Sequence, residues 1–464
     1  MKQAGAVTLV LSEALAAELA DASRMRVESA GVLLASLMST PEGALRVLGR
    51  EMRWVDEGAY LVREPDALSI RSEGYVAHLA SAEAEQAVAI WTHTHPHAPP
   101  VQSLADRGVD RDIAELFRLR SGSGRYGALI VSPDAGGDVA FSGFVEDEEG
   151  SARAFDRLWR VGDRLRLKPR YGALWQGVDA EFDRNVRAFG GAVQATLSDI
   201  HIGIVGTGGT GSAVAEQLVR LGVRRFTLLD PDHLSQSNVT RVYGSTPVDV
   251  GRPKVDVLAD HLTRIAPTAQ CKRLQATLMM ERAARAMTDC DLIFGCTDDN
   301  AGRLVLSRLA TYALTPVIDC GVLLSSGANG ALSGIDARVT YLAPGQACLI
   351  CRGRIDTARA AAELMTPEER VRLADEGYAP ALEGVEPAVV NFTTWVAAAA
   401  VSELIERLTG YGASPAPSEL LLRLHDREIS QNRAEPRERH YCHPASGKWG
   451  RGACEPFLDQ TWTR

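Results

Sequence analysis

Hydrophobic and polar positions divide the chain into two blocks with different rhythms. Within residues 1–155, short apolar runs of strand length alternate with polar turns. A helix is expected in this block over residues 106–120, where apolar side chains recur at helical spacing at Ile113, Leu116 and Phe117. The predicted strands are residues 31–38, 88–95, 126–133 and 138–145. This mixture predicts an α+β domain.

The second block, residues 195–430, alternates buried strands with amphipathic helices, as a doubly wound parallel sheet does. A long helix with a small apolar face is expected over residues 391–410, suited to close packing or to a subunit interface. The predicted strands are residues 200–206, 226–230, 292–298 and 315–321, with a helix over 212–222. Residues 156–194 are expected to be a linker that includes the first helix of this block, and residues 431–464 an irregular tail.

Composition describes an ordinary soluble globular protein, because 45% of the 464 residues are hydrophobic and 23% are charged. That balance excludes a disordered chain, a collagen and a coiled coil. The formal net charge of −9 gives no reason to expect nucleic acid or an anionic membrane as a partner. No segment has the roughly 20 apolar residues that span a bilayer. Glu13 and Glu18 interrupt the apolar N-terminal stretch, so we expect a strand and a helix there, in a cytoplasmic protein.

Two histidines near the end of a predicted strand begin a metal-site pattern. His93 and His95 are two residues apart, so on a strand they project to the same face. Ser103 follows seven residues after His95, and Asp106 follows Ser103 with two residues between them. Asp106 would complete a two-His, one-Asp zinc site with one position open to water, which is the mark of a catalytic site.

This spacing resembles the JAMM (MPN-type) metalloprotease family, whose motif is a Glu before a Gly-containing strand and then H-x-H-x7-S-x2-D. The resemblance implies an α+β JAMM-like domain over residues 1–155. It makes Glu28 the general acid/base, places zinc on His93, His95 and Asp106, and gives Ser103 the role of polarising the scissile carbonyl. Family members cleave peptide or isopeptide bonds after the terminal glycine of ubiquitin-like proteins.

Two other interpretations of these residues remain open. Ser103 and Asp106 also fit a helix-starting capping box that needs no metal. His97 continues the alternation of His93 and His95, so the three side chains could line a polar sheet face. In either case the peptidase-like half would be an inactive scaffold.

A glycine-rich turn after a buried strand marks a nucleotide site in the second block. Gly206, Gly208 and Gly211 satisfy G-x-G-x-x-G, in which the glycines allow phosphate to approach the start of a helix. Asp230 ends the next strand, where an acid that binds ribose belongs. Alone, these residues would indicate an NAD-dependent oxidoreductase.

The residues that follow change this assignment. Two cations, Arg241 and Lys254, follow Asp230 closely, and a pair of cations there serves a triphosphate better than nicotinamide. The sequence resembles the ThiF/MoeB and ubiquitin-activating enzyme family over about 235 residues. The shared motifs are G-x-G-G-x-G, D-x-D, S-N-x-x-R, G-x-x-K and a strand-ending Asp with Arg five residues later. The residues that match them are Gly206, Gly208, Gly209, Gly211, Asp230, Asp232, Asn238, Arg241, Lys254, Asp298 and Arg303.

The resemblance implies a Rossmann-like fold over residues 195–430 and adenylation of a carboxylate with ATP and Mg²⁺. Asp230 would hold the ribose, and Asn238 would support the phosphate site. Arg241 and Lys254 would hold the phosphates, and Asp298 the magnesium. Val242 departs from the family, which often has Gln there.

Arg184, in the segment FDRN, matches a family arginine that reaches the ATP of a partner subunit, so the resemblance also implies a homodimer.

The cysteines bear on the fate of an adenylate. The crossover segment 355–378, where the family usually carries its catalytic cysteine, has none. We prefer a structural zinc site of Cys348 and Cys351 with Cys442 and Cys454, or with a neighbouring His440 or His443 in place of a cysteine. A thiol nucleophile at Cys348 or Cys351 is the alternative. Cys290, Cys296 and Cys320 are expected to be small core residues.

These motifs together predict a two-headed enzyme that acts on the glycine-ending tail of a ubiquitin-like protein. The N-terminal half would trim or release the tail with zinc, and the C-terminal half would adenylate it. An alternative is activation of a sulfur carrier for a thiocarboxylate-based biosynthesis. A ubiquitin-conjugating-like enzyme or a sulfurtransferase would be the further partner.

Overall fold

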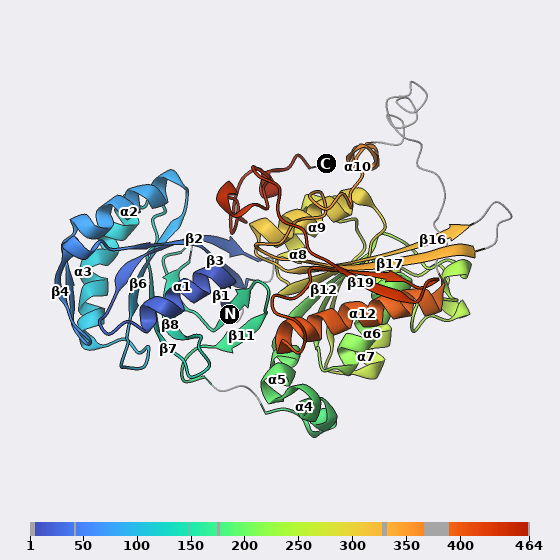
Figure 1. Ribbon diagram of the computed structural model, residues 1–464, viewed down its shortest axis with the longest axis horizontal. Helices are drawn as coiled ribbons and strands as arrows, with labels where there is room; N and C mark the ends of the chain where they lie inside the picture. Colours follow the sequence, from blue (N-terminus) through green and yellow to red (C-terminus); the bar gives the residue numbers. More distant parts are fainter. Residues whose placement is uncertain are drawn as a thin grey trace. The chain divides into compact units, whose positions relative to one another are not determined.

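The chain forms two compact units, each with its own sheet (Figure 1). The computed structural model describes residues 5–40, 43–147, 149–173, 177–326, 332–365 and 389–462. The N-terminal unit comprises Met1–Trp175 and Gly450–Glu455, and the C-terminal unit comprises Gln176–Trp449 and Pro456–Arg464. Among the described residues, no helix is both long and apolar enough to cross a bilayer.

The N-terminal unit is built on a mixed sheet that has nine strands in its described part, in the order β11-β10-β1-β3-β2-β6-β7-β8-β9. Its helices are α1 (Glu13–Ser23), α2 (Glu73–Ala84) and α3 (Leu104–Arg120). A small hairpin of β4 (Tyr60–Arg63) and β5 (Leu68–Ile70) follows the short helix η1 (Glu57–Ala59). The sheet strands are β1 (Val7–Ser12), β2 (Ala30–Ser39), β3 (Leu45–Trp54), β6 (Val88–Thr94), β7 (Gly127–Pro133), β8 (Val139–Glu146), β9 (Ala152–Ala154), β10 (Arg157–Val161) and β11 (Arg166–Pro169).

Helices cover both faces of this sheet, which explains why its central strands are apolar on both sides. Leu19 of α1 packs with Leu33 of β2 in one core cluster. Leu79 of α2 and Phe117 of α3 pack with Trp91 of β6 in the other. The four strands expected in this block are confirmed, and so are the strand and helix expected at the N-terminus.

The segment that follows residue 155 differs from the expected linker. Residues 156–194 include β10 and β11, and β10 pairs in parallel with β1, with Leu158 opposite Leu9. Alternation of apolar and basic residues makes this stretch look solvated, but Leu158 and Trp159 are fully buried. The sheet therefore continues beyond the boundary expected at residue 155.

A short piece of the C-terminal tail also belongs to the N-terminal unit. Gly452 lies against Met38, and a Cβ at position 452 would collide with the Met38 sulfur and approach Leu48 to 3.0 Å. Arg451 is 3.7 Å from Glu85. The tail is therefore packed in this unit and is not a free end.

The C-terminal unit contains a second sheet, with eight strands in the described residues, in the order β14-β13-β12-β15-β16-β17-β18-β19. The first five strands are parallel and the last three are added antiparallel. The strands are β12 (His201–Val205), β13 (Arg225–Leu229), β14 (Gln270–Leu274), β15 (Leu292–Gly295), β16 (Val317–Ser326), β17 (Leu332–Leu342), β18 (Glu419–Arg423) and β19 (Glu428–Asn432).

Helices again cover both faces of the sheet, as in a Rossmann-like fold: α6, α7 and α12 lie on one face, and α8 and α9 on the other (Figure 1). Strand order reverses between β12 and β15, and in open α/β sheets ligands bind at the carboxyl ends of the strands at such a point. The helices are α4 (Asp183–Phe189), α5 (Gly191–Asp199), α6 (Gly209–Arg220), α7 (Lys254–Ile265), α8 (Glu281–Met287), α9 (Asn300–Tyr312), α10 (Thr357–Glu363) and α12 (Val390–Thr409). The expected doubly wound arrangement is confirmed.

The long helix expected over residues 391–410 is α12, which packs against α6, β16 and β17. It ends at Gly410, whose φ of +70° is the left-handed conformation that glycine adopts most readily. In the crossover segment 355–378, α10 is the described helix, and residues 366–378 lie outside the described part of the chain.

Candidate functional site

His93, His95 and Asp106 come together where β6 ends and α3 begins. The Nε2 atoms of the two histidines are 3.2 Å apart. Asp106 Oδ1 lies 3.3 Å from His93 Nε2, and Asp106 Oδ2 lies 3.6 Å from His95 Nε2. Ligands of a tetrahedral zinc ion at about 2.0–2.1 Å are separated from one another by about 3.3 Å, so these three side chains fit zinc without rearrangement.

Neighbouring groups fix the direction of these ligands. His95 Nδ1 lies 3.0 Å from the carbonyl oxygen of Pro99 and donates to it, which leaves Nε2 as the nitrogen that would bind a metal. The capping box is also present: the Ser103 amide donates to Asp106 Oδ2 at 2.7 Å, and the Asp106 amide donates to Ser103 Oγ at 3.1 Å. The capping interpretation and the metal interpretation therefore apply to the same carboxylate.

The charges of the site are strongly coupled. Burial alone would raise the pKa of Asp106, but hydrogen bonds from His93 and His95 hold it well below its usual range. Burial opposes a charged His95, yet its hydrogen bond with Asp106 raises the pKa of His95. His97 is exposed, and its Nε2 lies 3.3 Å from the carbonyl oxygen of Arg26. His97 therefore does not join His93 and His95 on the same face.

Glu28 lies just before β2, whose residue Ala30 pairs with His93. Its backbone is held in place because its amide donates to Glu64 O at 3.0 Å and its carbonyl accepts from Arg63 Nε at 2.9 Å. Burial raises the pKa of Glu28, and the nearby His93 and His95 pull it in the opposite direction. The carboxyl group therefore lies within electrostatic reach of the histidine cluster, and its raised pKa suits a proton acceptor.

The glycine turn lies between β12 and α6 and is closely packed. Gly206 has a φ of +87°, and a Cβ there would lie 2.6 Å from the carbonyl oxygen of Cys296. A Cβ on Gly211 would overlap with the carbonyl oxygen of Gly206, whereas one on Gly208 would meet nothing within 4 Å. Two of these glycines are therefore required for the turn itself, and Gly208 leaves space at the helix N-terminus for a phosphate.

Asp230 ties this turn to the next strand. Its buried carboxylate accepts from the Thr207 amide at 2.7 Å, from Thr207 Oγ1 at 3.2 Å and from the Asp232 amide at 3.0 Å. Burial raises the pKa of Asp230, and Lys254, 3.9 Å away, works against that rise. Lys254 is also 2.7 Å from Asp232. Both Asp230, the residue expected to bind ribose, and Lys254, expected to bind phosphate, therefore lie beside the glycine turn.

Arg241 reaches the turn from a different segment. Its Cδ is 3.3 Å from where a Cβ of Gly209 would lie, and its Nη1 donates to Ser237 O at 3.2 Å. Asn238 is buried and its Oδ1 accepts from the Ser235 amide at 3.2 Å, which closes the short helix η3 (Gln236–Asn238). In the structure Asn238 therefore shapes the turn that presents Arg241.

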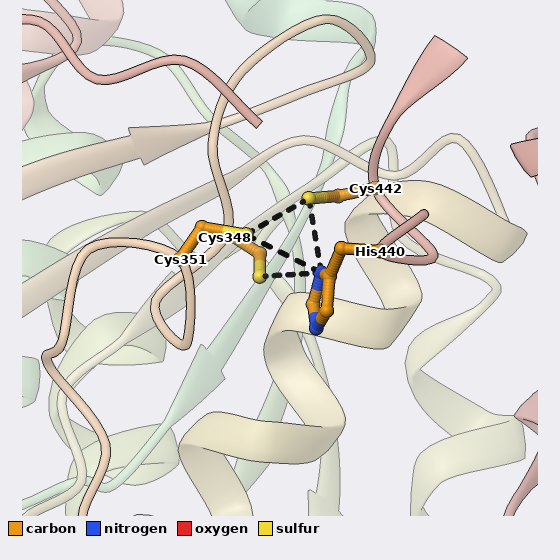
Figure 2. Close-up of side chains that lie close together, drawn as sticks. All are labelled: Cys348, Cys351, His440 and Cys442. Atoms are coloured by element: carbon orange, nitrogen blue, oxygen red, sulfur yellow. Dashed lines mark hydrogen bonds between the residues drawn. The ribbon is translucent and has the colours of Figure 1, made fainter. Parts of the chain in front are cut away.

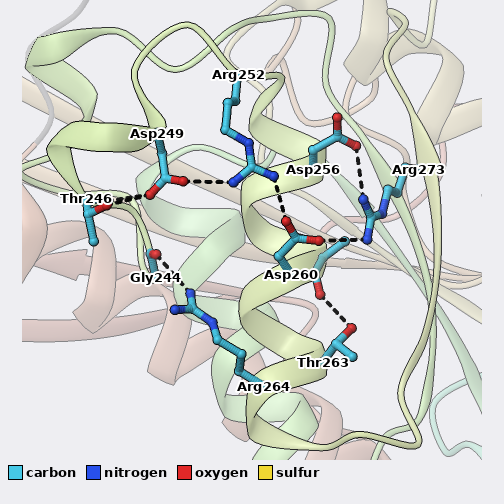
Figure 3. A network of polar contacts seen from close by, with 10 residues as sticks. Gly244, Thr246, Asp249, Arg252, Asp256, Asp260, Thr263, Arg264 and Arg273 are labelled. Carbon is cyan, nitrogen blue, oxygen red and sulfur yellow. Dashed lines mark hydrogen bonds and ion pairs between the residues drawn. The ribbon is translucent and has the colours of Figure 1, made fainter.

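An ion-pair network holds the loop that leads to Lys254 (Figure 3). Arg252 bridges Asp249, at 2.8 Å, and Asp260 of α7, at 2.6 Å. Arg273 of β14 contacts Asp260 at 2.9 Å and Asp256 at 3.5 Å. The network fixes the start of α7, of which Lys254 is the first residue.

Asp298 is exposed in the loop after β15, two residues beyond Cys296, whose carbonyl lies against Gly206. Asp299, its neighbour, caps α9 by accepting from the Gly302 amide. Arg184 is exposed on α4, and Phe182 of the same segment packs near Gly222, beyond the C-terminal end of α6. Arg184 is thus at the opposite end of α6 from the glycine turn.

A second cluster joins the C-x-x-C loop after β17 to the tail (Figure 2). His440 Nδ1 is 3.5 Å from Cys348 Sγ, 3.4 Å from Cys351 Sγ and 3.3 Å from Cys442 Sγ, and the last two sulfurs are 3.6 Å apart. Three thiols and an imidazole at these separations fit tetrahedral zinc. The Cys442 thiol lowers the pKa of Cys348 to about 5, and burial raises the pKa of Cys351.

Cys454 is not a member of this cluster, which corrects the preferred ligand set. Segment Gly450–Glu455, which contains Cys454, packs with the N-terminal unit, and His440 takes the fourth position. The H-x-C spacing of His440 and Cys442 already indicated that these two residues could bind the same metal ion. Cys290 and Cys320 are buried in the core as expected, and Cys296 is half-buried.

A model of the ThiF family matches residues 182–443. The molybdopterin-synthase adenylyltransferase of Escherichia coli is 34% identical over 37% of this chain and 65% of its own length. The E. coli sulfur carrier protein ThiS adenylyltransferase is 34% identical over 27% of this chain and 50% of its own.

The adenylyltransferase and sulfurtransferase MOCS3 of Danio rerio is 28% identical over 29% of each chain. The matches thus span between about a third and two thirds of these curated relatives. The family model begins at residue 182 and leaves the N-terminal unit outside the match.

The glycine turn yields a matched pair of substitutions. Gly211→Ala should lower the free energy of unfolding by about 1–3 kcal/mol and weaken ATP binding, because its methyl group overlaps backbone. Gly208→Ala should remain within about 0.5 kcal/mol of wild type, since its methyl group meets no atom. Urea unfolding and equilibrium nucleotide binding measure both effects. Equal stability of the two variants would contradict the packing described here.

Proposed function

The chain belongs to the ThiF family through residues 182–443, and from that premise we propose that its C-terminal unit adenylates the C-terminal carboxylate of a ubiquitin-like or sulfur-carrier protein. The observation that carries this proposal is the bond from the Thr207 amide to Asp230. It joins the glycine turn at the start of α6 to the buried acid that we propose holds ribose, with Lys254 beside it. The three relatives, all named as adenylyltransferases, support the same activity.

The reaction requires anionic groups to meet. A carboxylate oxygen of the carrier attacks the α-phosphorus of ATP, the bond from that phosphorus to the bridging oxygen breaks, and pyrophosphate leaves with the electron pair. Arg241 and Lys254 spread the charge that develops on the phosphates. Mg²⁺ would neutralise phosphate charge further, and the exposed carboxylate of Asp298 is the residue that would hold it. No protein nucleophile is needed for this step.

ATP–pyrophosphate exchange with a ubiquitin-like protein ending in Gly-Gly tests this activity. Asp298→Ala should reduce exchange at least about 100-fold, because the charge on the phosphates loses its metal partner. Asp426→Ala, in the turn between β18 and β19, is the control and should exchange like wild type. If Asp298→Ala and wild type exchange equally, adenylation at this site is refuted.

For the N-terminal unit we propose a JAMM-type zinc peptidase that cleaves after the terminal glycine of a ubiquitin-like protein. His93, His95 and Asp106 would hold the zinc, and their separations support this. When bound, zinc lowers the pKa of a coordinated water and polarises the scissile carbonyl. Glu28 would accept the water proton and return it to the leaving amine. Ser103 would help to polarise the carbonyl, although its hydroxyl already caps α3.

Glu28→Gln separates catalysis from metal binding. The amide cannot accept the proton, so cleavage of a ubiquitin-like precursor extended beyond Gly-Gly should fall at least about 100-fold while the zinc content stays unchanged. His95→Ala should lose both cleavage and one zinc ion, whereas exposed His97→Ala should keep both. Cleavage by Glu28→Gln at the wild-type rate would exclude this role. Absence of cleavage by wild type would favour a scaffold that only presents the carrier.

We propose a second, structural zinc on Cys348, Cys351, His440 and Cys442. Wild type should then contain about two zinc ions per chain by elemental analysis. Cys351→Ser and His440→Ala should each lose one zinc and lower the melting temperature of the C-terminal unit, because the tail would lose its anchor. Cys454→Ser should lose none. Retention of both ions by Cys351→Ser would rule this site out.

The product of adenylation separates two biological roles. The crossover segment 355–378 has no cysteine, and two relatives are named for sulfur transfer or a sulfur carrier, which favours a thiocarboxylate route. A carrier that gains one sulfur would identify that route, with a sulfurtransferase as partner. A thiol-labile adduct would identify conjugation, with a ubiquitin-conjugating-like partner. A homodimer in which Arg184 reaches the partner subunit's ATP completes the proposal.

A further inference from the structure

Two arginines from different elements meet over a residue that has no side chain. Gly321 of β16 is paired with Arg338 of β17. A Cβ at position 321 would lie 3.5 Å from Arg338 Nη2 and 3.6 Å from Nη2 of Arg303, which comes from α9. The three atoms nearest to that point all belong to these two guanidinium groups. The spot is therefore shaped for a small group with hydrogen-bond acceptors.

The charges around this spot do not balance within the described residues. Asp319, fully buried, is shared by Arg338, at 2.5 Å, and Arg303, at 3.4 Å. Glu419 is engaged by Arg354 at 2.8 and 3.0 Å and lies 4.0 Å from Arg338. The Arg352 guanidinium also lies within electrostatic reach of Glu419 and Arg338, so four guanidinium groups face two carboxylates.

The excess positive charge is only slightly exposed, since the side chains of Arg303 and Arg338 are 16% and 15% accessible. Keeping an excess charge away from water is costly unless an anion joins it. A bound carboxylate would remove that cost and would accept charge-assisted hydrogen bonds from both guanidinium groups.

The topology places this spot beside the proposed nucleotide site, on the side away from the residue expected to bind ribose. Asp319 pairs with Gly295, the last residue of β15, and β16 continues beyond it. Gly321 is therefore level with the loop that carries Asp298. In the sheet order, β16 is separated from β13, which ends at the ribose acid, by β12 and β15. A group that attacks the α-phosphate must approach from this free side.

We propose that Arg303 and Arg338 bind the C-terminal carboxylate of the polypeptide substrate over Gly321 and aim it at the α-phosphate of ATP. The inference rests on the proposed adenylation and adds the residues that select a free carboxylate. A tail that ends in glycine suits the spot, because it has no side chain to collide with the two guanidinium groups. Arg338 Nη2 donates to Asp319 and Arg303 Nη2 donates to the carbonyl oxygen of Cys320, which leaves the second hydrogen of each nitrogen for the ligand.

Gly321→Asp and Gly321→Asn test the anion site without any substrate. Position 321 is not in the left-handed region, so both side chains can be accommodated and they occupy the same volume. The aspartate would supply the missing carboxylate, so Gly321→Asp should melt about 2–4 °C above Gly321→Asn. An equal or higher melting temperature for Gly321→Asn would show that the site does not favour an anion, and the inference would be wrong.

Kinetics test the assignment to the substrate tail. The probe is a synthetic peptide that ends in Gly-Gly, as the free acid, with ATP–pyrophosphate exchange as the readout. Arg338→Gln should raise the KM for the peptide about 10- to 100-fold and leave the KM for ATP unchanged, while Arg338→Lys should restore part of the loss. An unchanged KM for the peptide, or a change confined to ATP, would restrict Arg338 to a structural ion pair with Asp319.

The two hypotheses fail in different ways. If wild type exchanges neither with the peptide nor with any ubiquitin-like protein, the proposed adenylation is wrong, and this assignment falls with it whatever the melting temperatures show. If wild type exchanges and Arg338→Gln has the wild-type KM for the peptide, adenylation stands and only the carboxylate site is wrong.

Discussion

The C-terminal unit depends on one buried carboxylate, that of Asp230. Its bonds to Thr207 and to the Asp232 amide connect the ends of β12 and β13, and Lys254 comes to it from the start of α7. Because the group is buried, an unpaired Asp230 would be costly, so the glycine turn has little freedom to move away. If the proposed nucleotide binds here, the turn is already ordered, which would lower the ordering cost of binding.

Local patterns in the sequence were enough to predict the parts of the sites that lie within one element or one turn. The i, i+2 spacing of His93 and His95 and the capping position of Asp106 are set by strand and helix geometry alone. Contacts between distant segments were not predictable in the same way. The parallel pairing of β10 with β1 spans about 150 positions. Apolar periodicity does not encode such pairing, so the buried strand β10 was taken for part of a linker. The cysteine spacing did point to a join between Cys348 and the tail, but it left open whether Cys454 or a histidine such as His440 completes the site.

Asp106 illustrates how one side chain can serve two purposes in the N-terminal unit. Its carboxylate satisfies a backbone amide at the start of α3 and also faces two imidazoles. The start of α3 is thereby tied to the strand that carries the histidines, so secondary structure, not a metal ion, holds these three side chains together. The same reasoning applies to Glu28, whose backbone is held by the β4–β5 hairpin. Preorganisation of this kind lets a metal bind with little structural adjustment.

The path of the tail has a consequence for how the protein comes apart. The chain passes from the N-terminal unit to the C-terminal unit, returns for Gly450–Glu455, and leaves again. Three covalent passages therefore join the units, and a single peptide-bond cut after Trp175 would release neither. A fragment made by stopping the chain at that residue would also lack the segment that fills the space beside Met38. A recombination event that replaced the N-terminal unit would therefore have to replace the segment coding for Gly450–Glu455 as well.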